Sequence, residues 1–598
     1  MSVPLELRLS MTRIAIAARH ALLSLFLAAA AHLALAGELP VVRGEVYVGT
    51  AKAAEAPGLL TTDDELPAMW LRLAAPAKSR LDAMEESSSR AKRREIGIGR
   101  EVATEAIEGG SNSLQWLLAG SVRIAKLRVV SAGAKALRVG LTFTGSTAVA
   151  EVRVAGSFDE TRTLGPARFG GLIANSDVFW TPVTEGETQV VEIAIPADAV
   201  IPTIGVPRIS HLVAGPSDRF AKRVSEIGAS GSCNIDVACV SNPSTALLNA
   251  ARSVVQMVFT RLNGGTSLCT GTILNDTDTT TQIPYLYSGN HCFEALSAPF
   301  NTAAQMQQIA STLNSYFFFD AVACGSLAVP SFVQRFGGAA FLYNNTSQDV
   351  LLLRLNDNLP SGAVLAGWDP NTIAAGTNMV VLHHPAGDLK KYSAGTVSGT
   401  KILDAPINAS TGFWQVTYSN GTTEGGSSGA GLFVFNNGEY LLKGGLWGGE
   451  AACGVNIASP DWYSRFDIAY PSLSAFLNKA SPTFNVTDLW WNPTENGNGM
   501  VLTQHASGQL VAIWYTYTNG NRPLWIIMAG GTWVNGTTFT GTLYVTTGTT
   551  QVGAFNAATT KNRPVGTGTY TFSSASTGSF TWTIDGVTVT KVFQRQDF

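Results

Sequence analysis

The sequence predicts an all-β core of two six-stranded antiparallel β-barrels with a short C-terminal helix, preceded by a mixed α/β segment and followed by a small β domain. The 598-residue chain is 45% hydrophobic and 14% charged with 60 glycines, which is typical of an ordered, turn-rich protein. From residue 232 to about 480, short apolar runs alternate with Gly, Asn and Ser turns. His291, Asp349 and Ser428 follow one another at separations of 58 and 79 residues, which suit two barrels.

The N-terminus has the features of a secretory signal peptide. An apolar run over residues 21–36 follows two arginines and ends in small residues, which predicts a signal over residues 1–36 with cleavage after Ala36. Met11 is an alternative start of the same signal. A membrane anchor is the competing interpretation, but the run is short for a membrane span. We therefore expect a secreted protein with no membrane association after signal removal.

Residues 37–227 form a cysteine-free segment that we expect to be a propeptide. Its second half alternates apolar and polar residues, the period of half-buried strands, and predicts a β-sandwich-like unit. The charged run 78–94 is interpreted as a solvated helix face rather than a binding site. The polar segment 218–231 contains the dibasic pair Lys222-Arg223, which predicts an exposed linker open to proteolysis.

Charge and cysteine usage narrow the classes of function. The formal net charge of −3 argues against a nucleic-acid-binding surface. All six cysteines lie in one stretch, which predicts three disulfides within one domain of an exported chain. Because no Cys-x-x-Cys pair occurs, we expect no metal site, and no other cofactor is expected. The cysteines are Cys233, Cys239, Cys269, Cys292, Cys324 and Cys453.

Two composition changes bound the central domain. It is predicted to span residues 228–480 and to end in an amphipathic helix over residues 471–478, with a proline near the start of that helix. After Ser481-Pro482 the chain becomes rich in Trp, Thr and Gly, and alternating runs predict a separate β domain over residues 485–598. The tryptophans of this domain are interpreted as core rather than as a ligand platform.

One histidine and one carboxylate have the sequence context of a hydrolytic site. His291 follows an apolar strand and adjoins Cys292, whose disulfide would fix its position, as a general base requires. Asp349 leads into a buried apolar run, where a carboxylate needs a hydrogen-bonding partner such as a histidine Nδ1–H. The pair His383-His384 is a competing base, but no carboxylate frames it, and a structural role is preferred.

The serine loop Thr423–Gly431 supplies the candidate nucleophile. Its sequence also satisfies the G-x-S-x-G elbow of α/β-hydrolases with Ser427 as nucleophile, but that fold needs an acid and a histidine further along the chain. The only downstream histidine, His505, lies in the last domain, so this alternative fails. Taken as Gly-x-Ser-Gly, the loop makes Ser428 the nucleophile. The backbone N–H groups of Gly426 and Ser428 would then form the oxyanion hole.

From these residues the chain resembles the lysyl endopeptidases, a family of secreted bacterial serine proteases with the chymotrypsin fold. The resemblance covers roughly residues 229–478 and rests on the cysteine-rich start at 231–239, Asn290-His291-Cys292, Asp349, the serine loop and Asp461-x-Tyr463-x-Arg465. It implies a chymotrypsin-like double barrel for the central domain. It also implies three disulfides, Cys233–Cys453, Cys239–Cys324 and Cys269–Cys292.

The same resemblance implies a specificity pocket. Asp461 matches the aspartate that binds a basic P1 side chain in the family, and its desolvated pairing with an ammonium would discriminate strongly. Trp447 and Gly448 would contact the substrate, although Trp447 stands where the well-studied members carry histidine. Acceptance of arginine therefore stays open. The alternative role for Asp461 is a loop carboxylate that pairs with Arg465.

These observations predict a secreted serine endopeptidase that cleaves after lysine, with a trypsin-like protease lacking strict lysine preference as the alternative. His291 would act as general base and then acid, Asp349 would orient it, and Ser428 would form the acyl-enzyme. The expected partners are protein or peptide substrates and the chain's own propeptide. Two rivals are a secreted binding protein with a catalytically silent protease fold and an esterase that uses the same triad.

Overall fold

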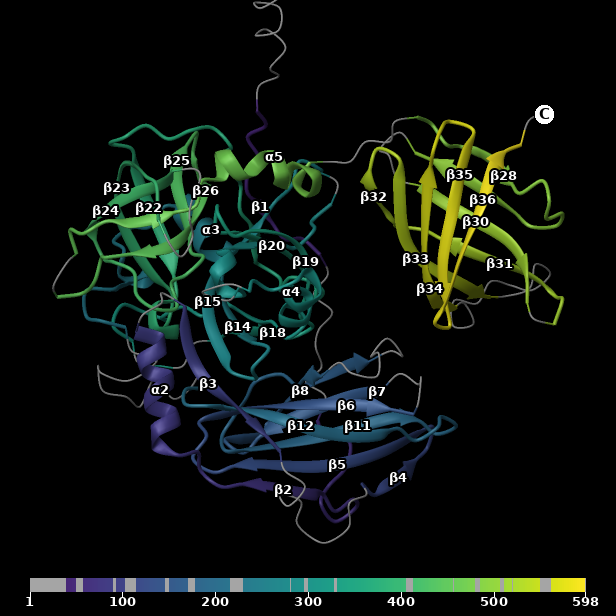
Figure 1. The fold of residues 1–598 in the computed structure, drawn as a ribbon, viewed down its shortest axis with the longest axis horizontal. Coiled ribbons are helices and arrows are strands. Elements are labelled where there is room, and N and C mark those ends of the chain that lie inside the picture. Colours follow the sequence, from purple (N-terminus) through teal and green to yellow (C-terminus); the bar gives the residue numbers. More distant parts are fainter. Residues whose placement is uncertain are drawn as a thin grey trace, which may run out of the picture. The chain divides into compact units, whose positions relative to one another are not determined.

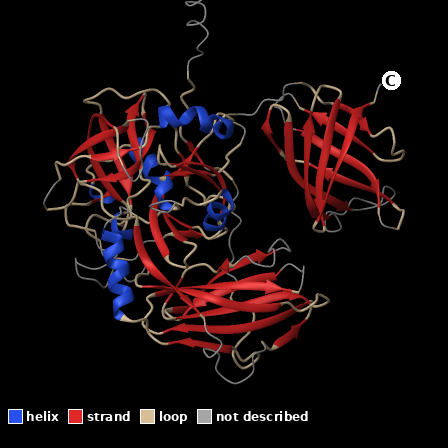
Figure 2. Cartoon of the chain, in the orientation of Figure 1, coloured by secondary structure: helices blue, strands red, loops and turns tan. Residues whose placement is uncertain are grey.

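The computed structural model describes most of the chain, and strands dominate it (Figure 2). The predicted signal peptide and most of the predicted linker lie outside the described residues. Within the described part, no helix has both the length and the hydropathy of a membrane span. The structure describes residues 39–596 except 50–57, 90–92, 103–113, 146–149, 170–177, 216–229, 280, 295–298, 327, 329–330, 405–411, 455–456, 479–483, 506–509, 519 and 549–560.

Residues 69–212 contain two β-sheets that share one core (Figure 1). One sheet has the order β2-β5-β11-β7-β8 with β4 beside β5, and β6, β12 and β3 belong to the other, with β9 and β10 beside β6. Leu127 and Val129 of one sheet and Val139 and Leu141 of the other are fully buried in this core. The alternation in the sequence therefore reflects two facing sheets.

The elements of this segment are β2 (Met69–Leu73), α2 (Lys78–Ser89), β3 (Arg94–Glu101), β4 (Trp116–Ala119), β5 (Val122–Ser131), β6 (Ala136–Thr144), β7 (Ala150–Gly156), β8 (Asp159–Phe169), β9 (Phe179–Trp180), β10 (Thr184–Glu185), β11 (Thr188–Pro196) and β12 (Thr203–Leu212). Before them, the short strand β1 (Glu45–Val46) pairs with β21 (Val364–Leu365) of the central domain.

The first sheet of the central domain differs from the predicted closed, six-stranded barrel. Its strands follow the order β18-β17-β14-β15-β16-β20-β19, and β3 of the preceding segment joins β15, which makes one 12-stranded sheet. Strand β16 pairs with β15 only at residues 272–274, so residues 266–268 of β15 offer a free edge that β3 occupies. The strands are β14 (Val254–Thr260), β15 (Thr266–Leu274), β16 (Tyr285–Ser288), β17 (Asn314–Phe317), β18 (Val333–Arg335), β19 (Ala339–Asn345) and β20 (Val350–Leu355).

The second sheet of the central domain closes on itself through an additional β23–β24 pairing, with β13 added at β23. The all-β class is thus confirmed, while the prediction of two six-stranded barrels is met only in part. The strands of this sheet are β13 (Ile235–Asp236), β22 (Asn378–His383), β23 (Lys391–Lys401), β24 (Phe413–Asn420), β25 (Gly431–Asn436), β26 (Glu439–Gly449) and β27 (Asp461–Tyr463).

Helices of the central domain pack on these sheets with locally encoded ends. Helix α3 (Thr245–Ser253) begins after Ser244, whose side chain accepts from the Leu247 amide, and α4 (Ala303–Ala310) begins with a capping box. Helix α5 (Phe466–Leu477) begins earlier than predicted, and Pro471 lies inside it rather than near its start. Its buried face joins the core because Phe466, Tyr470 and Leu473 recur at helical spacing.

The last segment of the chain forms a β-sheet with its own core. The sheet runs β31-β30-β29-β28-β36-β35-β34-β33-β32 and closes through an additional β31–β33 pairing at Ile527 and Tyr544. The strands are β28 (Asp488–Trp491), β29 (Gly499–Gln504), β30 (Leu510–Tyr517), β31 (Pro523–Met528), β32 (Thr532–Asn535), β33 (Thr538–Thr547), β34 (Lys561–Phe572), β35 (Thr577–Ile584) and β36 (Val587–Arg595).

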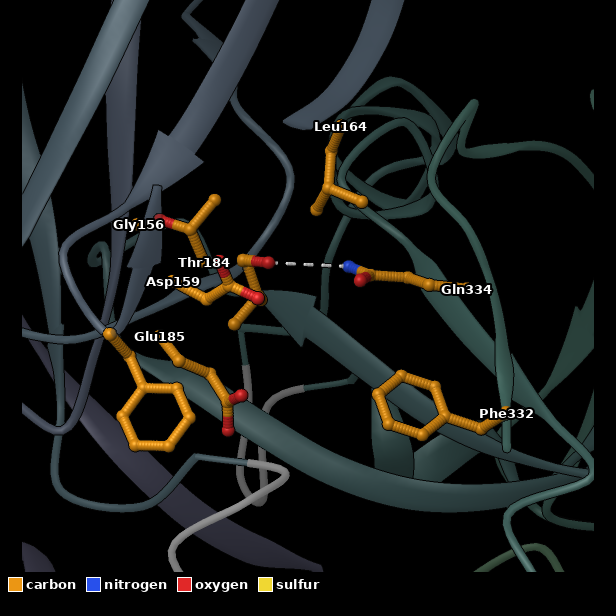
Figure 3. A pocket seen from close by; sticks show the side chains of 9 residues that line it. Gly156, Asp159, Leu164, Thr184, Glu185, Phe332 and Gln334 are labelled. Carbon is orange, nitrogen blue, oxygen red and sulfur yellow. Dashed lines mark hydrogen bonds between the residues drawn. The ribbon is translucent and has the colours of Figure 1, made fainter. Parts of the chain in front are cut away.

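Polar side chains tie the N-terminal segment to the central domain around β3. The fully buried Arg138 on β6 donates to the Thr181 carbonyl, to Thr260 Oγ1 and to the Thr312 carbonyl at 2.7–2.9 Å. Nearby, Gln334 Nε2 donates to the Val183 carbonyl at 3.4 Å, beside a small pocket lined by both segments (Figure 3). Because buried donors and acceptors are costly to leave unpaired, these bonds fix one docking register.

Candidate active site

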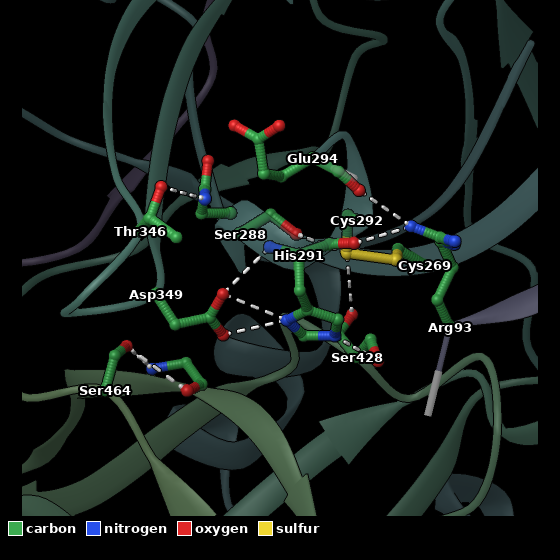
Figure 4. Close-up of polar contacts among 12 residues, drawn as sticks. Arg93, Cys269, Ser288, His291, Cys292, Glu294, Thr346, Asp349, Ser428 and Ser464 are labelled. Atoms are coloured by element: carbon green, nitrogen blue, oxygen red, sulfur yellow. Dashed lines mark hydrogen bonds and ion pairs between the residues drawn. A yellow bond between two sulfur atoms is a disulfide. The ribbon is translucent and has the colours of Figure 1, made fainter. Parts of the chain in front are cut away.

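The structure brings His291 into contact with Asp349 and Ser428 (Figure 4). His291 lies in a short 3-10 turn after β16, and the Cys269–Cys292 disulfide ties that turn to β15. Its Nδ1 is 2.8 Å from Asp349 Oδ2 and 3.0 Å from Oδ1, and its Nε2 is 2.6 Å from Ser428 Oγ. The spacing suits proton transfer from the hydroxyl to the imidazole, with the carboxylate fixing the ring orientation.

Asp349 is held in a strained turn that aims its carboxylate at the imidazole. The residue precedes β20 with φ of 52°, a left-handed conformation that costs free energy for a residue other than glycine. Its Oδ1 also accepts the backbone N–H of His291 at 2.8 Å, and its side chain is 2% exposed. The carboxylate is therefore buried with compensating donors, and those that the described part of the chain provides come from His291, the residue it orients.

Two glycines allow the serine loop to approach the first sheet. Gly429 has φ of 80°, and an added Cβ would lie 2.0 Å from Ser288 Oγ and 2.5 Å from the Thr270 carbonyl. Gly426 has φ of 99°, and its Cβ would lie 2.8 Å from the His384 carbonyl. Neither the Gly426 nor the Ser428 backbone N–H donates to a described residue, so the two amides are available to a developing oxyanion.

A buried histidine fixes the serine loop from the opposite side. His383 Nδ1 is 2.8 Å from Ser427 Oγ, and its Nε2 is 3.1 Å from Ser393 Oγ. Ser427 Oγ accepts the Glu424 N–H, and Ser393 donates to the Thr422 carbonyl. If the imidazole carries one proton, on Nε2, each donor in this series of hydrogen bonds faces an acceptor. His383 is thus a structural histidine, in keeping with the role that the sequence favours.

Asp461 is fully buried at the start of β27 and is held by hydroxyl donors. Its Oδ2 accepts the Tyr418 hydroxyl at 3.0 Å and the Thr423 hydroxyl, and its Oδ1 accepts the Ala451 N–H at 3.3 Å. Burial and the neighbouring Asp461 raise the pKa of Tyr418 well above its ordinary value, so the phenol remains a donor. No local signal in the sequence identifies Tyr418, which lies on β24, whereas Thr423 belongs to the serine loop itself.

The remaining predicted pocket residues lie beside Asp461. Gly448 pairs with Trp462 in the β26–β27 ladder, and a register shift there leaves Trp447 in a bulge, where its ring packs 6.1 Å from that of Trp462. An added Cβ on Gly449 would lie 2.1 Å from Asp461 Oδ1. Arg465 pairs with Asp467, its Nε lying 3.1 Å from Oδ1, which leaves the alternative pairing with Asp461 without support.

The structure contains the disulfides Cys233–Cys453, Cys239–Cys324 and Cys269–Cys292, which are the pairs that the resemblance implies. The first of them brings the start of the central domain to the serine loop. There the Gly231 N–H donates to both carboxylate oxygens of Glu424 at 3.1 and 3.2 Å, and Asn234 Nδ2 donates to Oε1 at 3.0 Å.

Arg93 of the N-terminal segment reaches the backbone around the candidate base (Figure 4). It is 2% exposed, and its Nη1 donates to the carbonyls of His291 at 2.8 Å and Glu294 at 3.1 Å. Burial and the nearby Arg261 lower the pKa of Arg93 to about 9. The interpretation of residues 78–94 as a solvated helix face is wrong at this position, because α2 ends at Ser89 and the chain turns into β3.

The chain is similar to known proteins over both of these segments. The model of the "Lysyl endopeptidase, C-terminal domain" family matches residues 227–464, and that of the "Lysyl endopeptidase N-terminal domain" family matches residues 72–213. A lysyl endopeptidase of Pseudomonas aeruginosa is 32% identical over 399 residues, which are 64% of this chain and 81% of that protein.

Solved structures give weaker likenesses. The active form of the Rv3671c protease from M. tuberculosis is 16% identical, with a TM-score of 0.28, over 42% of this chain and 91% of that one. The HtrA-type protease AlgW with a tripeptide is 14% identical, with a TM-score of 0.27, over 59% and 96%. Likenesses this distant carry no argument about the site.

His383 yields a prediction about catalysis. Replacing it by leucine removes both hydrogen bonds that brace the serine loop, and we expect kcat to fall by about 10- to 100-fold because the oxyanion amides lose their fixed position. His383→Gln, whose amide can donate and accept, should recover part of the loss. KM should change little in both variants, as measured with a peptide amide substrate.

The matched control is His384→Gln. This neighbour is equally buried, and its Nδ1 bonds the Asp388 carbonyl at 3.0 Å rather than the serine loop. If the His384 variant lost as much kcat as the His383 variants at equal folded fraction, the loss would reflect general packing and the proposed bracing would be rejected.

Proposed function

The chain belongs to the lysyl endopeptidase family, and we propose that it hydrolyses peptide bonds on the carboxyl side of lysine by the Ser428, His291 and Asp349 triad. It is a serine endopeptidase. The observation that carries the proposal is the 2.6 Å contact between His291 Nε2 and Ser428 Oγ, with Asp349 on the opposite ring nitrogen.

The proposed reaction follows from these contacts. Ser428 Oγ attacks the substrate carbonyl carbon while its proton passes to His291 Nε2, and the carbonyl oxygen becomes an oxyanion bound by the Gly426 and Ser428 amides. The imidazolium then gives the proton to the leaving amine, and the C–N bond breaks to form the acyl-enzyme. A water molecule then attacks the acyl-enzyme carbonyl while His291 accepts its proton. Collapse of this second intermediate returns the proton to Ser428 Oγ and releases the peptide carboxylic acid. Asp349 stabilises the imidazolium and holds the ring tautomer.

Asp461 is the proposed determinant of specificity. It is a fully buried carboxylate whose Oδ2 accepts hydroxyl hydrogen bonds from Tyr418 and Thr423, and an ammonium that reached it would pair with a desolvated negative charge. A trypsin-like pocket would carry its carboxylate six residues before the nucleophile. That position is Thr422 in this chain, so it has no negative charge. A single lysine ammonium needs only one such acceptor. A guanidinium binds best to both oxygens of a carboxylate at once, and both oxygens of Asp461 already accept hydrogen bonds from the protein.

We also propose that residues 1–36 are a cleaved signal, residues 37–227 a propeptide, residues 228–480 the protease and residues 485–598 an accessory domain of a secreted zymogen. The match of residues 72–213 to the family's N-terminal domain supports the propeptide. The pairing of β3 with β15 and the reach of Arg93 to the His291 carbonyl support a propeptide that docks on the enzyme. Cleavage after Lys222 would then suit the proposed lysine specificity, and cleavage after Arg223 would suit the trypsin-like alternative.

Cleavage-site mapping tests the specificity. On a denatured protein mixture, the processed enzyme should cut at Lys-X bonds, and Ser428→Ala should reduce the rate by about 10⁶-fold. Asp461→Asn should reduce kcat/KM for lysine substrates by about 10²-fold or more, because the buried ammonium would lose its partner.

Equal cutting after arginine and lysine would contradict strict lysine preference and favour a trypsin-like enzyme. Cleavage of small esters without cleavage of peptides would favour the esterase. Thr422→Ala is the matched control, because it changes the position where trypsin-like enzymes carry the pocket carboxylate and leaves Asp461 in place. The preference of this variant for lysine substrates should equal that of the parent enzyme.

Arg93 yields a prediction about the propeptide. With the segment 37–223 added back to the processed enzyme, Arg93→Met should weaken inhibition or complex formation by roughly 10- to 100-fold, because two buried carbonyls would lose a charged donor. Titration of residual activity measures the change. Arg123→Met is the control, since this arginine bonds the Ala199 carbonyl of its own segment. Equal weakening by both variants would contradict a specific role for Arg93.

A further inference from the structure

The C-terminal domain is a closed β-sheet, and one end of its interior is polar and aromatic rather than filled by core residues. On β30, Leu510 and Ala512 point inward and are at most 1% exposed, and Trp514 and Thr516 continue that inward row. On β36, Phe593 is 4% exposed and Lys591 shares its face. A lysine therefore occupies an inward-facing position at this end of the sheet.

A cavity of about 150 Å³ lies at this end, and Trp514, Thr516 and Lys591 are among the residues that line it. Trp514 and Trp582 form one wall, with ring centroids 4.6 Å apart, and both are half-buried, so part of each indole faces the cavity. Trp491 lies at the end of β28, and the loop after it supplies Asn492 and Asn498 to the lining. The ends of closed sheets are a common position for small-molecule sites.

The charged residues of the cavity neutralise each other. Lys591 Nζ lies 2.6 Å from Glu495 Oε2, and the two side chains are 43% and 30% exposed. A ligand with a net charge would have to displace one partner of this pair to find its counter-charge. A neutral ligand with hydroxyl groups can donate to the carboxylate and accept from the ammonium while the pair stays intact.

We propose that this cavity binds a neutral pyranose sugar. The apolar face of a sugar ring fits against the indole wall, while its hydroxyl groups reach the Lys591–Glu495 pair and the two asparagines, which both donate and accept. The small volume suits one ring, as at the end of a glycan chain, rather than a large ligand. The tryptophans of this domain thus divide: Trp490 and Trp533 are core, as the sequence predicts, and Trp514 and Trp582 also serve as a platform.

The proposal is independent of the protease chemistry and is tested on the full chain carrying Ser428→Ala, which cannot digest itself by the proposed reaction. The sugars are methyl glucoside, N-acetylglucosamine and β-1,4-linked oligomers of glucose and of N-acetylglucosamine. Each is titrated into the protein, and binding is followed by saturation-transfer NMR and calorimetry. We expect saturable binding of at least one of them. Glu495→Gln and Lys591→Met should each weaken that binding by about tenfold or more, because each removes a charged hydrogen-bonding partner. Both positions are partly exposed, so the variants should fold.

Trp525→Ala is the matched control, because this indole is 61% exposed on β31 and does not line the cavity. Its affinity for the sugar should equal that of the parent. The proposal is overturned if no sugar in the panel binds saturably, or if Glu495→Gln and Lys591→Met both bind the sugar as well as the parent. It is also overturned if Trp525→Ala loses as much affinity as those two variants. Tighter binding of free lysine or of inorganic phosphate than of any sugar would also overturn it.

Discussion

The position of Ser428 Oγ against His291 Nε2 depends on how two sheets of the central domain meet, because the base and the nucleophile come from different sheets. Strand β15 makes that junction: the Thr270 N–H donates to the Ser428 carbonyl at 2.8 Å, and Thr270 Oγ1 donates to the Gly426 carbonyl at 3.0 Å. Gly429 makes the close approach possible, and the Cys269–Cys292 disulfide fixes the histidine to the same strand. The geometry of the site is therefore a property of this junction.

The N-terminal segment pairs with the same strand, along the part of its edge that β16 leaves free. Since β3 pairs with residues 266–268 of β15, it lies only a few residues from Thr270, and Arg93 just before it bonds the His291 carbonyl. A segment docked in this way can stabilise the junction while it stays bound. The structure thus gives a physical reason why one region could both assist folding and restrain the finished site.

Local patterns in the sequence were sufficient for the residues whose chemistry is special. His291, Asp349 and Ser428 were predicted from their flanking residues, and the structure brings them together. Partners defined by long-range strand pairing were not predictable, because neither the β3–β15 register nor the hydroxyl group of Tyr418 beside Asp461 has a local signature. The inward direction of Lys591 also depends on long-range strand pairing, because a sheet has an interior only when it closes on itself.

Covalent labelling with a phosphonylating fluoride, followed by peptide mapping of the processed enzyme, tests the central claim most directly. The reagent needs an activated serine beside a base and an oxyanion site. The account predicts one modified residue, Ser428, and loss of labelling in the His291→Ala variant. Labelling of another serine, or undiminished labelling of Ser428 without His291, would contradict the triad assembled at the β15 junction.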